Sequence, residues 1–154
     1  MPKITREEVR VPADVMPEAR DEYITNYLKA TRETGRLMLF ACDQKIEHLN
    51  KDFYGEGIDI ADLDPEHLFK IGSEGVCGVL AGQRGLVAQY AADYPEINYL
   101  IKMNSKTNLV GTKQEDPYSP QLYDLDAVLA MKEAGVNIVG LGHHGGLVLG
   151  AEVD

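Results

Sequence analysis

Cysteine is scarce in this chain of 154 residues, which contains only Cys42 and Cys77. Neither belongs to a Cys-x-x-Cys motif, and the pattern lacks the disulfide framework of a small secreted protein. A free thiol in an apolar run behaves as a small buried hydrophobic side chain. Long apolar runs are missing too. The first residues, MPKITREEVRVP, lack the apolar core of a signal peptide, and no window approaches the roughly 18 apolar residues of a membrane span. We therefore expect a cytoplasmic chain.

Positive charge is in short supply. The chain has 15 Lys and Arg against 25 Asp and Glu, so its formal net charge is −10. Because both halves are acidic, neither offers the positive field on which nucleic-acid binding depends. We expect neither nucleic acid nor a membrane as a partner. An anionic small molecule is not excluded, because a few local lysines or backbone N–H groups can bind a phosphate.

The residues that are present are ordinary for a folded protein, with 44% hydrophobic and 26% charged residues. Residues 1–17 contain three prolines and form an extended leader without regular structure, and residues 18–154 form one domain. Four short apolar runs follow, each expected to be a strand: residues 37–42, 76–81, 99–103 and 136–141. Helices are expected at residues 18–34, 65–75, 83–93 and 125–135, with Asp64 and Asp124 as N-caps. The first run, LMLFAC, is apolar on both faces, which indicates a strand buried on both sides.

This alternation predicts βα units around a parallel sheet, and therefore the α/β class. Such units form an open doubly wound sheet or a (β/α)8 barrel, and both place their chemistry at the carboxyl ends of the strands. No G-x-G-x-x-G or G-x-x-x-x-G-K-[ST] motif follows the first run, so dinucleotide and P-loop binding are not supported. We favour a (β/α)8 TIM barrel, of which about four βα units, a half barrel, are present.

Polar side chains follow the first apolar run, where a site is expected. Asp43 ends this run abruptly, next to Gln44 and Lys45 and just before His48. Its carboxylate is suited to binding a substrate hydroxyl or relaying a proton. The alternative is a loop cap or a salt bridge to Lys45.

Lys102 lies inside the third run, where alternation places it on the same face as Leu100 and Asn104. A lysine inside a barrel is costly unless it is paired, and a desolvated lysine suits Schiff-base chemistry or anion binding. The alternative is a structural ion pair with an inward carboxylate such as Asp43. Just beyond, Asn104 and Lys106 belong to a polar segment, NSKTN, that is suited to binding a sugar or a phosphate.

His143 and His144 follow the fourth run and invite a metal-site interpretation. Adjacent residues of a strand point to opposite faces, and no further ligand lies at a recognised spacing. The sequence therefore predicts no metal site.

Three segments carry a resemblance to a known family: RLMLFACDQKIEHLNKDFYGEGI, DPEHLFKIGSEG, and YLIKMNSKTNLV with DPYSPQLYDLDAV. They resemble the archaeal-type class I fructose-bisphosphate aldolases, the DhnA-like family, from about Arg6 to Leu141. The resemblance implies a (β/α)8 barrel of glycolysis or gluconeogenesis. Such an enzyme cleaves fructose 1,6-bisphosphate into two triose phosphates through a lysine Schiff base, without a metal or other cofactor.

The resemblance also implies roles for individual residues. Asp43 matches the aspartate at the end of the first strand, which contacts substrate and supports proton movement, and Lys102 lies in the segment that matches the third strand. The family's Schiff-base lysine lies on the sixth strand, beyond the four units predicted here. We therefore expect the N-terminal half of such an enzyme, inactive alone. Its expected catalytic residues are Asp43 and Lys102, and its expected residues for binding a phosphorylated sugar are Gln44, Lys45, His48, Asn104 and Lys106.

Three other hypotheses stay open. One is a related aldolase or transaldolase of aromatic amino-acid precursor synthesis. Another is a non-catalytic half barrel that forms a homo-oligomer or pairs with a C-terminal half, because four βα units leave two unpaired sheet edges and an uncovered apolar interior. The third is a gene fragment with no independent role.

Overall fold

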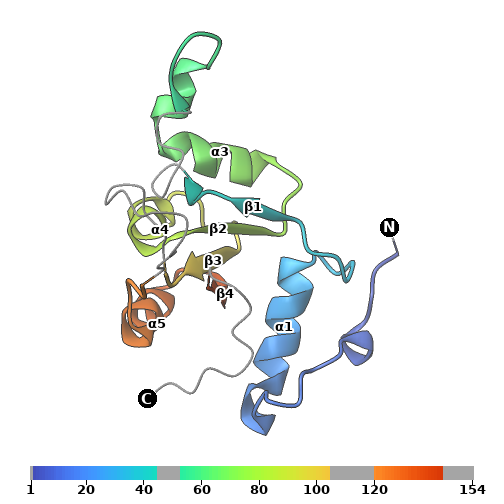
Figure 1. Ribbon diagram of the computed structural model, residues 1–154. Coiled ribbons are helices and arrows are strands. Elements are labelled where there is room, and N and C mark those ends of the chain that lie inside the picture. Colours follow the sequence, from blue (N-terminus) through green and yellow to red (C-terminus); the bar gives the residue numbers. More distant parts are fainter. Residues whose placement is uncertain (1, 45–52, 105–119, 144–154) are drawn as a thin grey trace, which may run out of the picture.

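Four parallel strands form a single sheet in the order in which they occur along the chain (Figure 1). The structure is a computed structural model that describes residues 2–44, 53–104 and 120–143. The strands are β1 (Leu39–Ala41), β2 (Val79–Gln83), β3 (Tyr99–Lys102) and β4 (Ile138–Gly142). The helices are α1 (Arg20–Ala30), α3 (Glu66–Glu74), α4 (Arg84–Tyr90) and α5 (Leu125–Glu133), with 3-10 turns at η1 (Arg6–Glu8), η2 (Pro17–Ala19) and η4 (Ile60–Leu63). This alternation confirms the α/β class and fits part of a (β/α) barrel.

Helices α3, α4 and α5 cover one face of the sheet, and the core lies beneath them. Phe69 of α3 stands at its centre, with ring centroids 4.9, 5.9 and 6.2 Å from those of Tyr90, Tyr94 and Tyr99. The other buried members include Leu80, Val87, Ile101, Met103, Val128 and Met131. In β1, β2 and β3 every second residue faces this layer, as the period of two requires. In β4 a register shift against β3 breaks the alternation, so that Ile138 lies in the core while Gly140 and Gly142 lie against Leu100.

The opposite face of the sheet is not covered by any of the described elements, and it corrects one prediction. The run LMLFAC was expected to be buried on both sides, but Leu39 is 39% exposed and Met38, which precedes the strand, is 64% exposed. Only Phe40 of β1 packs against the core. The sequence showed that both faces are apolar, but it did not show that the described part of the chain covers only one of them.

Helix α1 closes the amino end of the sheet rather than either face. Its last turn lies against the residues that lead into β2, β3 and β4: Asn98 Nδ2 lies 3.4 Å from the carbonyl of Lys29, and Lys29 Nζ lies 3.4 Å from Asn137 Oδ1. Gly78 approaches α1 so closely that a Cβ atom there would lie 1.8 Å from the carbonyl oxygen of Ala30. This end is therefore sealed by backbone packing and neutral amides.

Most predicted elements are present, with shifted boundaries. α1 ends at Ala30, four residues before its predicted end, because Arg32 and Glu33 adopt left-handed φ values of 50° and 61° that no helix can contain. β2 begins at Val79, three residues later than predicted, and Val76 is 80% exposed. The predicted cap of α5 is confirmed, since the Asp124 carboxylate accepts a hydrogen bond of 2.8 Å from the Ala127 N–H.

The leader is more ordered than its sequence suggested. It contains η1 and ends at the first residue of η2, and it runs along α1, where the Arg6 guanidinium donates hydrogen bonds to Asp21 (2.7 Å) and Thr25 (3.1 Å). The Ile4 N–H also donates to the Glu33 carbonyl at 2.7 Å. Among the described residues, no helix has both the length and the apolar character that a membrane crossing requires.

Candidate active site

A buried ion pair joins two of the predicted site residues at the carboxyl end of the sheet. Lys102, the last residue of β3, donates from Nζ to Oδ2 of Asp43, which follows β1, at 2.5 Å. The Lys102 side chain is 7% exposed and that of Asp43 is 15% exposed. Both point inward because side chains of alternate strands share a layer inside a barrel. The sequence placed both residues on inward positions, and the structure brings them into contact.

This pair is the structural ion pair that the sequence left open as an alternative for Lys102. Burying two charges is expensive, and their attraction offsets that cost only while both partners are present. Such a pair adds little net stability compared with apolar side chains of similar volume.

The pair faces an open hollow of about 330 Å³ on the uncovered face of the sheet. Apolar residues of three strands form one part of its lining: Leu39, Ala41, Ala81 and Leu100. Polar residues at the strand ends form the rest: Asp43, Gln44, Lys102 and His143, together with Gly142. Apolar walls with a few convergent polar groups are typical of a small-molecule site.

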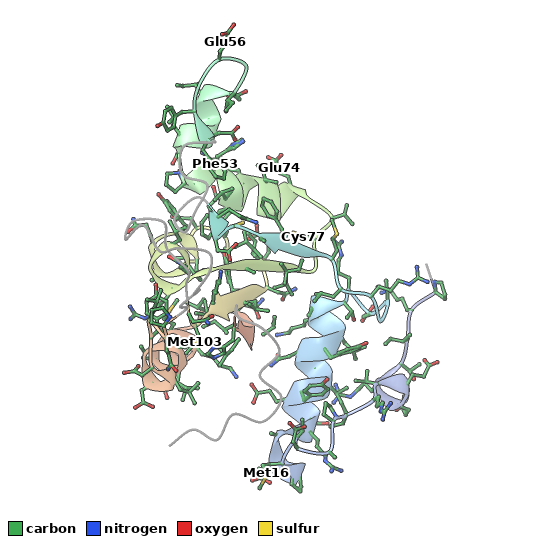
Figure 2. The ribbon with its side chains drawn as sticks, viewed as in Figure 1. Met16, Phe53, Glu56, Glu74, Cys77 and Met103 are labelled. Carbon is green, nitrogen blue, oxygen red and sulfur yellow. The ribbon has the colours of Figure 1, made fainter. Side chains whose placement is uncertain are left out.

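Cys42 stands beside the pair but is not suited to chemistry. It is buried on the helix-covered side of the sheet, and burial, followed by the charge of Asp43, raises the pKa of its thiol to about 12. A thiol that stays protonated is a poor nucleophile. The prediction of a buried apolar cysteine is confirmed for Cys42. Cys77, labelled in Figure 2 in the loop before β2, is only half-buried, with its sulfur 3.2 Å from the Gly72 carbonyl.

The remaining predicted residues divide into two groups. Gln44 lines the hollow, and Asn104 is buried just beyond Lys102, where its backbone bridges to Gln121. Lys45, His48 and Lys106 lie outside the described residues, as does His144. Within the described ranges, no three His, Cys, Asp or Glu side chains are grouped so as to hold a metal ion.

Gln83 is a buried polar residue beside Lys102 in the sheet that the sequence interpretation did not select. It ends β2, pairs in register with Lys102, and is 6% exposed. The sequence contained the signal, because Gln83 stands two positions after Ala81 in an apolar strand and so shares its face. A neutral amide at a strand end is not distinctive by itself, since such residues are common in loops.

Three comparisons place this geometry among known proteins. Residues 37–144 match the sequence profile of the DeoC/LacD family aldolases. The chain is 50% identical over 143 residues to the fructose-bisphosphate aldolase/6-deoxy-5-ketofructose 1-phosphate synthase of Methanocaldococcus jannaschii, a match that covers 92% of this chain and 45% of that protein. It also superimposes on the fructose-bisphosphate aldolase of Slackia heliotrinireducens with a TM-score of 0.87 and 75% identity, again covering 92% and 45%. The chain thus spans about half the length of these relatives.

Proposed function

Because the chain belongs to the DeoC/LacD family of aldolases, we propose that it provides the first four βα units of an enzyme that cleaves a phosphorylated ketose, such as fructose 1,6-bisphosphate. The observation that carries the proposal is the buried Asp43–Lys102 pair, which faces a hollow at the carboxyl ends of the strands. In (β/α)8 enzymes this end of the barrel holds the active site. The relatives named above as fructose-bisphosphate aldolases support the choice of substrate class.

The proposed reaction assigns a task to each charged group. A lysine outside the four described strands forms a Schiff base with the ketose carbonyl. The substrate hydroxyl on the carbon β to this iminium then loses its proton, the adjacent carbon–carbon bond breaks, and its electron pair moves into the iminium. Asp43 accepts the hydroxyl proton, directly or through a water molecule. Lys102 orients the Asp43 carboxylate and supplies positive charge beside the developing alkoxide, rather than acting as the nucleophile.

A chimaeric enzyme tests this proposal. Residues 1–141 of this chain would replace the matching part of the 75% identical Slackia heliotrinireducens aldolase, so that all barrel strands are present. We expect borohydride-sensitive release of triose phosphate from the chimaera and none from the 154-residue chain alone. Asp43→Asn should lower kcat by at least about 100-fold, the usual size of a general acid–base contribution.

The control for this experiment is Asp93→Asn, which changes an exposed aspartate near the opposite end of the sheet. It should leave kcat unchanged. Full activity of the Asp43→Asn chimaera would remove Asp43 from the reaction. Borohydride-sensitive cleavage by the 154-residue chain alone would show that no further strands are required.

The open face also supports a proposal about assembly. No described strand pairs with the outer edge of β1 or of β4. Leu39 of β1, Leu141 of β4 and Leu129, on α5 beside β4, are each at least 39% exposed. Unpaired strand edges beside apolar surface favour association. We propose that this chain associates with a copy of itself or with a C-terminal half. Size-exclusion chromatography with light scattering should show a dimer or a larger species, and a stable monodisperse monomer would contradict the proposal.

A further inference from the structure

A second hollow, of about 360 Å³, opens where the chain enters β1 and β2, at the end of the sheet opposite the ion pair. Its apolar lining includes three large side chains that are each more than 50% exposed: Leu37, Met38 and Val76. None of them lines the hollow beside Asp43 and Lys102. Exposed apolar side chains that gather in one place are typical of a surface on which another protein packs.

Two arginines supply the charge of this second hollow. Arg32 and Arg36 both line it, and both are exposed. In the part of the chain that the structure describes, neither guanidinium makes a hydrogen bond or an ion pair, whereas the neighbouring Glu33 is paired with Lys3. Arginine is enriched at protein interfaces, where its planar group binds carboxylates. This arginine hollow therefore fits a partner surface that is both apolar and acidic.

An arm of the same chain has that composition. Residues 53–64, which include η4, contain four acidic residues and no lysine or arginine. The arm also carries three large apolar side chains that are each at least 49% exposed: Tyr54, Ile60 and Leu63. Figure 2 shows this acidic arm projecting from the body of the molecule, with Phe53 at its base and Glu56 at its tip. The arm therefore presents both apolar and acidic groups to its surroundings.

The carboxylates of the acidic arm differ in how far they are already bonded. Asp59 and Asp64 each accept a hydrogen bond from the backbone N–H two residues later, at 2.9 and 3.0 Å, and Asp62 lies 3.6 Å from His67. The Glu56 carboxylate has no such partner among the described residues. The tip of the arm thus carries an unpaired negative charge, as the arginine hollow carries unpaired positive charge.

The arm and the hollow of one molecule do not meet. The arm ends where α3 begins, and Val76 of the hollow follows the end of α3. A helix of nine residues is about 14 Å long, so α3 holds the two surfaces apart. Figure 2 shows the same separation between Glu56 and Cys77, the neighbour of Val76. A contact between the two surfaces therefore requires two molecules.

We propose that the acidic arm of one copy of this chain docks in the arginine hollow of a second copy. Glu56 pairs with Arg32 and Arg36, and the exposed apolar side chains of the two surfaces pack against each other. Opposite charges on the two surfaces steer the copies together and fix how they are oriented. The contact uses neither the ion pair nor the strand edges, so it does not depend on the proposed reaction.

Photo-crosslinking of the 154-residue chain tests this contact. Benzoylphenylalanine in place of Tyr54 brings a photoreactive ketone to the arm. A mixture of isotope-labelled and unlabelled chains then identifies cross-links between copies by mass spectrometry. We expect these cross-links at residues 30–38 or 76–78 of the other copy. The same probe at Gln89, an exposed position on α4, is the control and should give no cross-links to those residues.

Charge reversal tests the pairing itself. The double change Arg32→Glu and Arg36→Glu opposes acid to acid and should lower the cross-linked fraction at least about tenfold. Adding Glu56→Arg to the same chain should restore much of it, because the charges are then opposite again. Arg10→Glu reverses an exposed charge of the leader and should leave the cross-linked fraction unchanged.

Several results would overturn the proposal. Cross-links that fall only on the strand edges or the open sheet face would place the contact elsewhere. An absence of cross-links between copies would mean that the hollow receives something else, such as a C-terminal half. A cross-linked fraction that charge reversal does not change would exclude the pairing. If the arginine variants do not fold, the cross-links mapped with both arginines in place decide the question. The chimaeric enzyme tests the reaction separately, so either proposal can fail without the other.

Discussion

The two ends of the four-stranded sheet are built from different kinds of interaction. At the amino end, Asn137 donates from Nδ2 to the side chain of Asn98 at 2.8 Å, and Asn98 donates to the Gly78 carbonyl at 2.9 Å. This ladder of neutral amides lies under the last turn of α1. At the carboxyl end, the main polar contact is the Asp43–Lys102 ion pair, and the space beside it is open.

The polar contacts at the two ends differ in how much they contribute to the stability of the fold. Neutral amides that satisfy backbone carbonyls stabilise the fold and add no desolvated charge. A buried ion pair contributes little net stability but concentrates charge where a ligand can meet it. The amino end therefore fixes the strands in place, and the carboxyl end holds a buried ion pair beside an open hollow.

The largest expected effect comes from breaking the ion pair one partner at a time. Asp43→Asn leaves a buried ammonium and Lys102→Met leaves a buried carboxylate, so each should lower the free energy of unfolding by about 3 kcal/mol. The double variant contains neither charge and should return to within about 1 kcal/mol of the wild type. Urea unfolding of the four proteins measures the coupling. Lys70→Met, at an exposed i,i+4 pair on α3, is the matched control and should change stability little. Simply additive losses would mean that the two residues do not act as a pair.

At the amino end, the corresponding change is Gly78→Ala. The added methyl group would meet the Ala30 carbonyl at 1.8 Å, and neither backbone can move without displacing α1 or β2. We expect a loss of about 2 to 3 kcal/mol in urea unfolding, at the upper end for an overpacked site. Gly85→Ala is the control, because nothing lies within 4 Å of its Cβ position on α4. It should be neutral or stabilising, since alanine favours a helix. Equal stability of the two variants would argue against close packing of α1 on the sheet.

The sequence predicted the carboxyl end better than the amino end, for a physical reason. Strand periodicity and the parallel arrangement fix which residues point inward at a strand end, so the local pattern around Asp43 and Lys102 is enough to place both on one face. The approach of α1 to Gly78 depends on how a helix 48 residues earlier docks against the sheet. No local pattern around Gly78 encodes that contact.

The misplaced boundaries have the same origin. Helical spacing and the stop at Gly35 predict a helix through residue 34, but Arg32 and Glu33 turn the chain with left-handed backbones that glycine usually supplies. Similarly, Val76 fits the pattern of a buried strand but lies in the exposed loop between α3 and β2. In both cases tertiary packing overrides a preference that the local sequence expresses.

A smaller effect distinguishes the carboxyl end in alkaline solution. Burial raises the pKa of the Cys42 thiol from 9.0 to about 12, so above pH 9 the unfolded chain loses a proton that the folded chain keeps. Stability from this group is complete below pH 9 and declines as the pH rises toward 12. Between pH 8 and 10.5, wild-type protein should lose about 2 kcal/mol more than Cys42→Ala. Urea titrations at both values measure this difference. Cys77→Ala retains Cys42 and should follow the wild type, and identical pH slopes for wild type and Cys42→Ala would contradict the burial of the thiol.

The smallest effect belongs to a charge at the amino end, the ion pair between Glu22 of α1 and Lys132 of α5. The hydrogen bond from Lys132, and then its charge, lowers the pKa of the Glu22 carboxyl below its ordinary value of 4.5. A lowered pKa gives stability that is present above pH 4.5 and disappears as the pH falls through the folded-state value. Because the pair is exposed, Glu22→Gln should cost less than about 1 kcal/mol at pH 7. Thermal unfolding should show the two proteins converging in acid, with Glu18→Gln unchanged throughout. If Glu22→Gln instead lowered the free energy of unfolding by several kcal/mol at pH 7, the amino end would depend on charge rather than on packing. The two ends would then not differ in the way described above.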